Sequence, residues 1–98
     1  MQIQLSAKNF ELAETLKTQM EKKLKRLERL KDWIHYIKVT LHKSPHVSEV
    51  EFEVKPHKGD TMIVREEAKT LQKAFDSALK IVKRRIKEYK KQKVDKKS

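Results

Sequence analysis

Apolar residues recur along this chain with two spacings, one typical of helices and one typical of strands. From Leu12 to Leu30 they form a stripe with steps of three and four residues, which predicts an amphipathic helix with Asn9 as its expected N-cap. A second stripe with the same steps begins after Thr70, the expected cap of the last helix, and continues to about Tyr89. Two amphipathic helices are therefore predicted.

Four other segments alternate between apolar and polar residues, which predicts strands with one dry face. They are Gln2–Ser6, the segments centred on Val39 and Phe52, and Thr61–Glu67. The predicted order is β-α-β-β-β-α. Since a sheet with one dry face needs a cover, we expect an α+β two-layer sandwich, in which two helices lie on one face of a four-stranded, mainly antiparallel sheet.

The length of 98 residues predicts one domain. We expect this domain to span residues 1–93 and a loose basic tail to span residues 94–98. No apolar run approaches the roughly 18 residues of a membrane span, and the N-terminus lacks the apolar stretch of a signal peptide. An intracellular, cytoplasmic location is the expectation.

The chain is strongly basic, with 25 Lys and Arg residues against 14 Asp and Glu, a net charge of +11 and a pI near 9.9. Such a charge attracts polyanions, nucleic acid first and anionic membranes second. Between Lys80 and Lys93 eight bases accompany one acid, so the bases repel one another unless a polyanion is present. By charge placement we predict RNA contacts at Lys22, Arg29, Lys80, Lys83, Arg85, Lys87 and Lys91.

Aromatic residues are sparse, and the three Phe residues are expected in the core. Only Trp33, Tyr36 and Tyr89 remain to stack on bases, which argues against recognition of single strands by stacking. Contact with phosphates and with the shape of folded RNA is favoured instead.

Catalytic and metal-binding signals are weak. The chain has no Cys and one Gly, which excludes thiolate zinc sites, Cys nucleophiles and glycine-rich phosphate loops. His42 and His46 flank a turn, but solvated histidines explain them better than metal ligands do. Glu49, Glu51 and Glu53 are expected on a solvated strand face, balanced by cross-strand bases. We therefore expect no enzyme, no metal and no cofactor.

Three local patterns are similar to those of one known family. They are MQIQLSAKNFELAETLK at the start, KKLKRLERLKDWI in the first helix, and AFD at Ala74–Asp76 followed by Val82, Arg84 and Ile86. On these residues, and on the order of elements, the chain resembles the short form of the bacterial ribosome hibernation-promoting factors, the family that includes ribosome-associated inhibitor A. The resemblance extends from Met1 to about Lys93. It departs from the family at Ile81 and Glu88, where Lys is common.

The resemblance implies a function without catalysis. Family members bind the small ribosomal subunit between its head and body, occupy the path of mRNA and the decoding-side tRNA sites, stop translation and preserve the ribosome. The implied partners are 16S-type rRNA, neighbouring ribosomal proteins and the whole ribosome. RNA contacts are implied at Lys23, Arg26 and Arg84, with Lys90 next. The dimerising domain of long members is absent, so we expect a monomer off the ribosome.

Two other functions fit parts of the pattern. A general binder of double-stranded RNA or DNA could have the same topology and charge. It should hold a plain duplex nearly as well as a ribosome. A protein of anionic membranes is the third hypothesis, but the apolar stripe of the last helix is already needed to cover the sheet.

Overall fold

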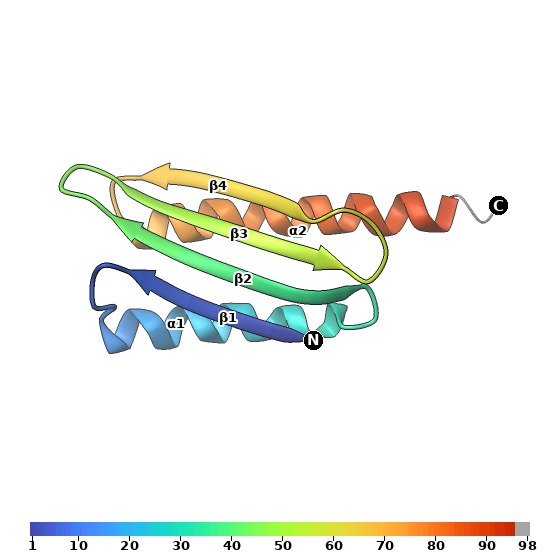
Figure 1. The fold of residues 1–98 in the computed structure, drawn as a ribbon, viewed down its shortest axis with the longest axis horizontal. Helices are drawn as coiled ribbons and strands as arrows, with labels where there is room; N and C mark the ends of the chain where they lie inside the picture. The colour runs from blue at the N-terminus through green and yellow to red at the C-terminus, as the bar shows by residue number, and fades with distance from the viewer. Residues whose placement is uncertain (96–98) are drawn as a thin grey trace.

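The elements of the structure follow the predicted order (Figure 1). A computed structural model describes residues 1–95, with side chains described through residue 92. The elements are β1 (Gln2–Lys8), α1 (Glu14–Lys25), the 3-10 helix η1 (Arg26–Leu30), β2 (Ile34–Lys43), β3 (Ser48–Pro56), β4 (Met62–Ala68) and α2 (Leu71–Asp95).

The four strands form one sheet in the order β1-β2-β3-β4. β1 pairs with β2 in parallel, because the chain returns through α1 before it enters β2. The pairs β2–β3 and β3–β4 are antiparallel and joined by short turns. The predicted α+β fold with a mainly antiparallel sheet is thereby confirmed.

Both helices lie on the same face of the sheet, α1 along β1 and α2 along β3 and β4 (Figure 1). They run in the same direction, so their C-terminal ends lie at the same end of the molecule. The core fills the space between the layers. At its centre Phe52 of β3 and Phe75 of α2 are almost fully buried, with ring centroids 5.6 Å apart. Removing this apolar area from water provides the main driving force for packing the helices on the sheet.

The start of the first helix differs from the prediction. α1 begins at Glu14, its N-cap position is Ala13, and no side chain caps it. The expected cap, Asn9, lies outside the helix, with a φ of 65° in the turn after β1. Asn tolerates this left-handed conformation better than most residues, which explains its place there. At the other helix the prediction is confirmed, since Thr70 accepts a hydrogen bond of 3.2 Å from the backbone N–H of Lys73.

The last helix is longer than its apolar stripe. α2 continues to Asp95, six residues beyond Tyr89, and its final turns extend past the end of the sheet (Figure 1). Val94 and Asp95, which were expected in the tail, are therefore helical. The rest of the predicted tail, residues 96–98, lies outside the described residues, so the division at residue 93 stays a prediction.

Candidate nucleic-acid interface

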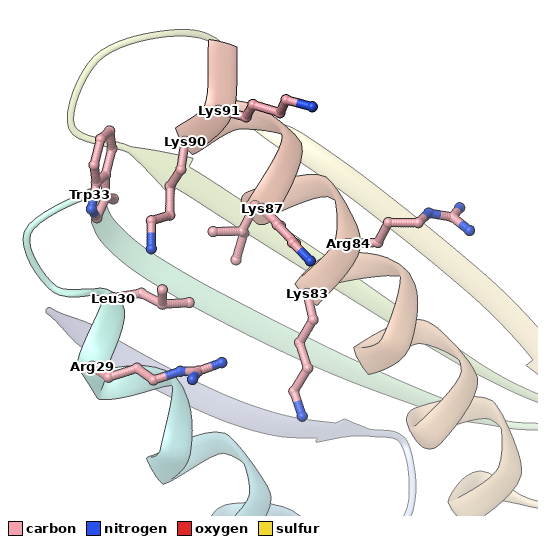
Figure 2. A pocket seen from close by; sticks show the side chains of 9 residues that line it. Arg29, Leu30, Trp33, Lys83, Arg84, Lys87, Lys90 and Lys91 are labelled. Atoms are coloured by element: carbon pink, nitrogen blue, oxygen red, sulfur yellow. The ribbon is translucent and has the colours of Figure 1, made fainter. Parts of the chain in front are cut away.

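A groove runs between the two helices on the side of the molecule that faces away from the sheet. Its wide part, of about 890 Å³, lies where η1 and the C-terminal half of α2 run side by side (Figure 2). Leu30, Trp33 and Ile86 give this part apolar surface. Its cationic residues are Arg29, Lys83, Arg84, Lys87, Lys90 and Lys91.

A narrower part of about 280 Å³ lies toward the middle of the helices. It is lined by Lys23, Arg26, Asp76, Leu79, Lys80 and Lys83. Because Lys83 lines both parts, they form one path between α1 and α2. We call the two parts together the cationic groove.

The backbone of each helix explains why the bases gather there. Arg26 and Arg29 lie three residues apart in η1, and a 3-10 helix has three residues per turn, so both side chains project from the same face. Leu27 and Leu30 are eclipsed in the same way on the buried face. The predicted helix therefore ends as a 3-10 helix, and this ending aligns the two arginines along the groove.

On α2 the bases recur at steps of three and four residues, which places them beside the buried stripe that contains Val82 and Ile86. Figure 2 shows Lys83 and Lys90 directed between the helices, while Arg84 and Lys91 point away from α1 on the outer rim. The C-terminal ends of both helices lie near the wide part, and the negative end of each helix dipole favours bases at this position.

The groove carries almost no compensating negative charge. Of the acids whose side chains the structure describes, Asp76 alone lines it, and it pairs with Lys23 across the two helices at 2.7 Å. Among the described side chains, none of the other groove bases forms an ion pair. Like charges packed this closely raise the local potential and attract anions from solution.

The sequence prediction named eleven bases, and nine of them line the cationic groove. The two exceptions are Lys22 and Arg85. Lys22 is exposed on α1 but does not line the groove. Arg85 donates a hydrogen bond of 3.2 Å to the backbone carbonyl of Ile63 in β4, so it lies on the sheet side of α2. Whether any of the eleven contacts RNA stays a prediction.

The three aromatic residues considered for stacking are in different settings. Trp33 is half-buried and lines the wide part of the groove. Tyr89 packs edge-to-face against Trp33 and donates its hydroxyl to the carbonyl of Lys58. Tyr36 lies on the open face of the sheet, away from the groove, and donates to the Glu53 carboxylate at 2.6 Å. Only Trp33 therefore combines an aromatic ring with the groove bases.

The open face of the sheet has a different chemistry. Acids on β3 pair with neighbours there, for example Glu51 with Arg65 of β4 at 2.5 Å. The hydrogen bond to Glu53 raises the pKa of the Tyr36 hydroxyl, and the one to Glu51 raises the pKa of the Arg65 guanidinium. The predicted solvated row of acids, Glu49, Glu51 and Glu53, is half-buried and partly paired. This mixed surface attracts polyanions less than the groove does.

Other kinds of site find no support in the described part of the chain. Within it, no three His, Cys, Asp or Glu side chains come together as a group that could hold a metal ion. None of the helices in residues 1–95 combines the length and the apolar character needed to cross a membrane.

The fold and the groove define a class: a small two-layer α+β domain whose two helices present a cationic groove. The chain belongs to the family described as Sigma 54 modulation protein / S30EA ribosomal protein, which matches residues 3–94. The family expected from the sequence is thereby confirmed.

Two solved structures share the fold. A ribosomal subunit interface protein from Coxiella burnetii is 26% identical, with a TM-score of 0.80, over 92% of this chain and 98% of that one. The N-terminal domain of Protein Y from Thermus thermophilus is 30% identical, with a TM-score of 0.76, over 91% of this chain and 99% of that one. Among curated proteins, no significant match is found.

Proposed function

We propose that this protein is a ribosome hibernation factor that binds the small ribosomal subunit through its cationic groove. The observation that carries the proposal is the gathering of nine bases from α1, η1 and α2 along one groove, in a member of a ribosomal protein family. The similar structure from Coxiella burnetii is described as a ribosomal subunit interface protein, which supports the same partner.

The proposed site is the decoding channel, where the protein occupies the path of mRNA and tRNA and so blocks translation in idle ribosomes. An elongated domain with extents of 50 × 21 × 17 Å suits a cleft between two bodies of RNA. Contacts to rRNA phosphates come from both groove walls, with Lys23, Arg26, Arg84 and Lys90 as the first candidates. The remaining groove bases strengthen the positive electrostatic potential that attracts these phosphates.

This function needs no chemical step. Binding alone excludes the competing ligands, so the proposal assigns neither a catalytic residue nor a cofactor. The protein acts where ribosomes are, in the cytoplasm, as a monomer before it binds.

Sedimentation with ribosomes tests the proposal. The purified protein is centrifuged with small subunits and with whole ribosomes, either empty or filled with mRNA and tRNA, beside a plain RNA duplex at the same salt. We expect binding to empty ribosomes and small subunits, and exclusion from filled ones. Free binding to filled ribosomes would place the site elsewhere and contradict the proposal.

The plain duplex separates this function from a general binder of double-stranded nucleic acid. Both functions predict binding that weakens with salt, because both rest on phosphate contacts. Equal affinity for the duplex and for the ribosome would favour the general binder.

A further inference from the structure

The wide part of the cationic groove contains one aromatic ring among its bases, that of Trp33 (Figure 2). We propose that this part binds a single unpaired RNA nucleotide, with the base stacked on the indole of Trp33 and the adjoining phosphates on Arg29, Lys83 and Lys90. The inference rests on the proposed function and deepens it, because it names the kind of RNA structure that the groove selects.

The backbone around Trp33 is fixed on both sides. Its N–H donates to the carbonyl of Leu30 at 2.9 Å, which ties it to the end of η1. Its own carbonyl accepts from the N–H of His57 at 2.9 Å, which ties it to the turn after β3. The backbone of Trp33 is thus held at the mouth of the groove by two elements that are distant in sequence, and this backbone needs no further ordering on binding.

The ring itself is supported from α2. Tyr89 packs against it edge-to-face, with centroids 6.2 Å apart and planes at 87°. The Tyr89 hydroxyl in turn donates to the Lys58 carbonyl, and the neighbouring Gly59, with a φ of 118°, provides the turn against which the phenol lies. This arrangement makes Trp33 a preformed stacking surface.

A cation already lies over this surface. The ammonium of Lys90 is 5.6 Å from the centre of the Trp33 ring. At a solvent-exposed site a cation–π contact of this kind is weaker than stacking of a nucleobase on an aromatic ring. A base can therefore replace the ammonium over the indole, and the displaced Lys90 is then close to the phosphate of the same nucleotide.

The side chains of the wide part are hydrogen-bond donors without acceptors. Lys, Arg and Trp side chains donate only, and within residues 1–92, whose side chains are described, no Asp, Glu, Asn, Gln, Ser or Thr lines this part. A phosphate presents only acceptors and matches this lining. A carboxylate is also only an acceptor, so the basic lining alone fits either anion. The Trp33 ring among these bases, on which a nucleobase can stack, favours the nucleotide over an acidic protein segment.

The base must be unpaired because a duplex hides the faces of its bases. Within an uninterrupted helix each base stacks on its neighbours, whereas a looped-out nucleotide exposes its face. A single ring provides room for one base, so the groove is expected to recognise a bulge or loop in folded RNA rather than a long single strand.

Trp33 is the only tryptophan of the chain, so its fluorescence reports directly on stacking. The unmodified protein is titrated with three RNA hairpins of equal length: one with a single bulged adenosine, one with an abasic nucleotide at the bulge, and one without a bulge. Small ribosomal subunits are titrated in parallel. The same series is repeated with Trp33→Leu and, as the conservative variant, with Trp33→Tyr.

We expect the bulged hairpin to quench the fluorescence and to bind about 10-fold more tightly than the abasic one, the value typical of one stacked base. This advantage should disappear in Trp33→Leu and persist in part in Trp33→Tyr. Since Trp33 also contacts the core, thermal unfolding checks both variants. The fluorescence of the unmodified protein tests stacking independently of their stability.

The outcomes separate this inference from the proposed function. Equal binding of all three hairpins without quenching, together with binding to small subunits, overturns the stacking site and leaves the proposed function standing. Failure to bind small subunits overturns the proposed function itself. If polyglutamate at equal charge displaces the hairpin and produces the same quenching, the groove belongs to an acidic protein partner and the inference is wrong.

Discussion

At the scale of single residues, the ion pair between Lys23 and Asp76 has two opposing effects. It joins the two groove walls at 2.7 Å, yet it occupies a base that is proposed to contact RNA. Both side chains are well exposed, at 37% and 47%, so the pair contributes less than about 1 kcal/mol to folding. Its influence on the potential of the groove is therefore of more consequence than its influence on stability.

We predict that Asp76→Asn strengthens binding to small subunits by about two- to fivefold, because it frees Lys23 and removes the acid from the groove. The control is Glu67→Gln, which removes the same charge from an exposed position of β4. Equilibrium sedimentation or filter binding measures the difference. An equal gain in both variants would assign the effect to net charge alone.

A second residue-scale prediction concerns the core. Phe75→Ala should lower the free energy of unfolding by about 3–5 kcal/mol, because it leaves a cavity beside Phe52 at the centre of the molecule. Urea unfolding followed by circular dichroism measures the loss. Ile63→Ala serves as the control: this side chain is 42% exposed on the open face, and its removal should change stability by no more than about 0.5 kcal/mol. Similar losses in both variants would contradict this description of the core.

At the scale of secondary-structure elements, α2 serves two purposes on two faces. Its buried stripe, which includes Ala78, Val82 and Ile86, covers the sheet. Its bases stand beside that stripe and form one wall of the groove. The covering face and the proposed binding face can therefore be altered separately.

We predict that Arg84→Glu with Lys87→Glu leaves the unfolding free energy within about 1 kcal/mol and weakens binding to small subunits by at least about 10-fold. Both side chains are exposed and line the groove. The control is Lys8→Glu with Lys43→Glu, an equal charge reversal at exposed positions of β1 and β2 outside the groove. If the control weakens binding equally, the interface is not the groove.

The elements also show what the sequence could predict. The order β-α-β-β-β-α followed from periodicity, because each face pattern has a period that only one kind of element satisfies. The ends of elements are harder to predict: a cap depends on the direction in which the chain enters the helix, so the polar side chain of Asn9 does not mark the start of α1, whose N-cap position is Ala13. The change to 3-10 geometry at Arg26 is not predictable from the apolar spacing, because steps of three residues fit both kinds of helix.

The groove, too, could be predicted from the sequence only in part. Its bases could be predicted because they lie off the apolar stripes. The pairing of Lys23 with Asp76 could not, since 53 residues separate them and only the fold brings them together. The support of the Trp33 ring could not be predicted from the sequence either, because it comes from Tyr89 and from the turn at Gly59.

At the scale of the whole molecule, charge is distributed unevenly between the two faces. The helix side has the cationic groove, while the open sheet face carries the acids of β3 beside bases such as Lys38 of β2 and Arg65 of β4. A polyanion is therefore attracted to the molecule in one orientation. This asymmetry links the net charge of +11 to a specific surface.

We predict that binding to small subunits weakens steeply with salt. If ~6 of the groove bases neutralise phosphates, the logarithm of the binding constant should fall against the logarithm of salt with a slope of about −4 to −5. Titrations between 50 and 200 mM salt measure this slope. The Arg84 and Lys87 double variant should lower its magnitude by about 1 to 2, and a slope near zero would exclude binding through phosphates.

The two walls of the groove come from opposite parts of the chain, and this has a consequence for synthesis. α1 and η1 are made early, whereas α2 is made after every other described element. Until α2 has left the ribosome, the inner faces of β3 and β4 lack their cover and the groove lacks its second wall. A ribosome that is translating this message thus carries a nascent chain whose binding surface is incomplete. The proposed inhibition of translation therefore requires α2, and a nascent chain that still lacks α2 does not carry the complete groove.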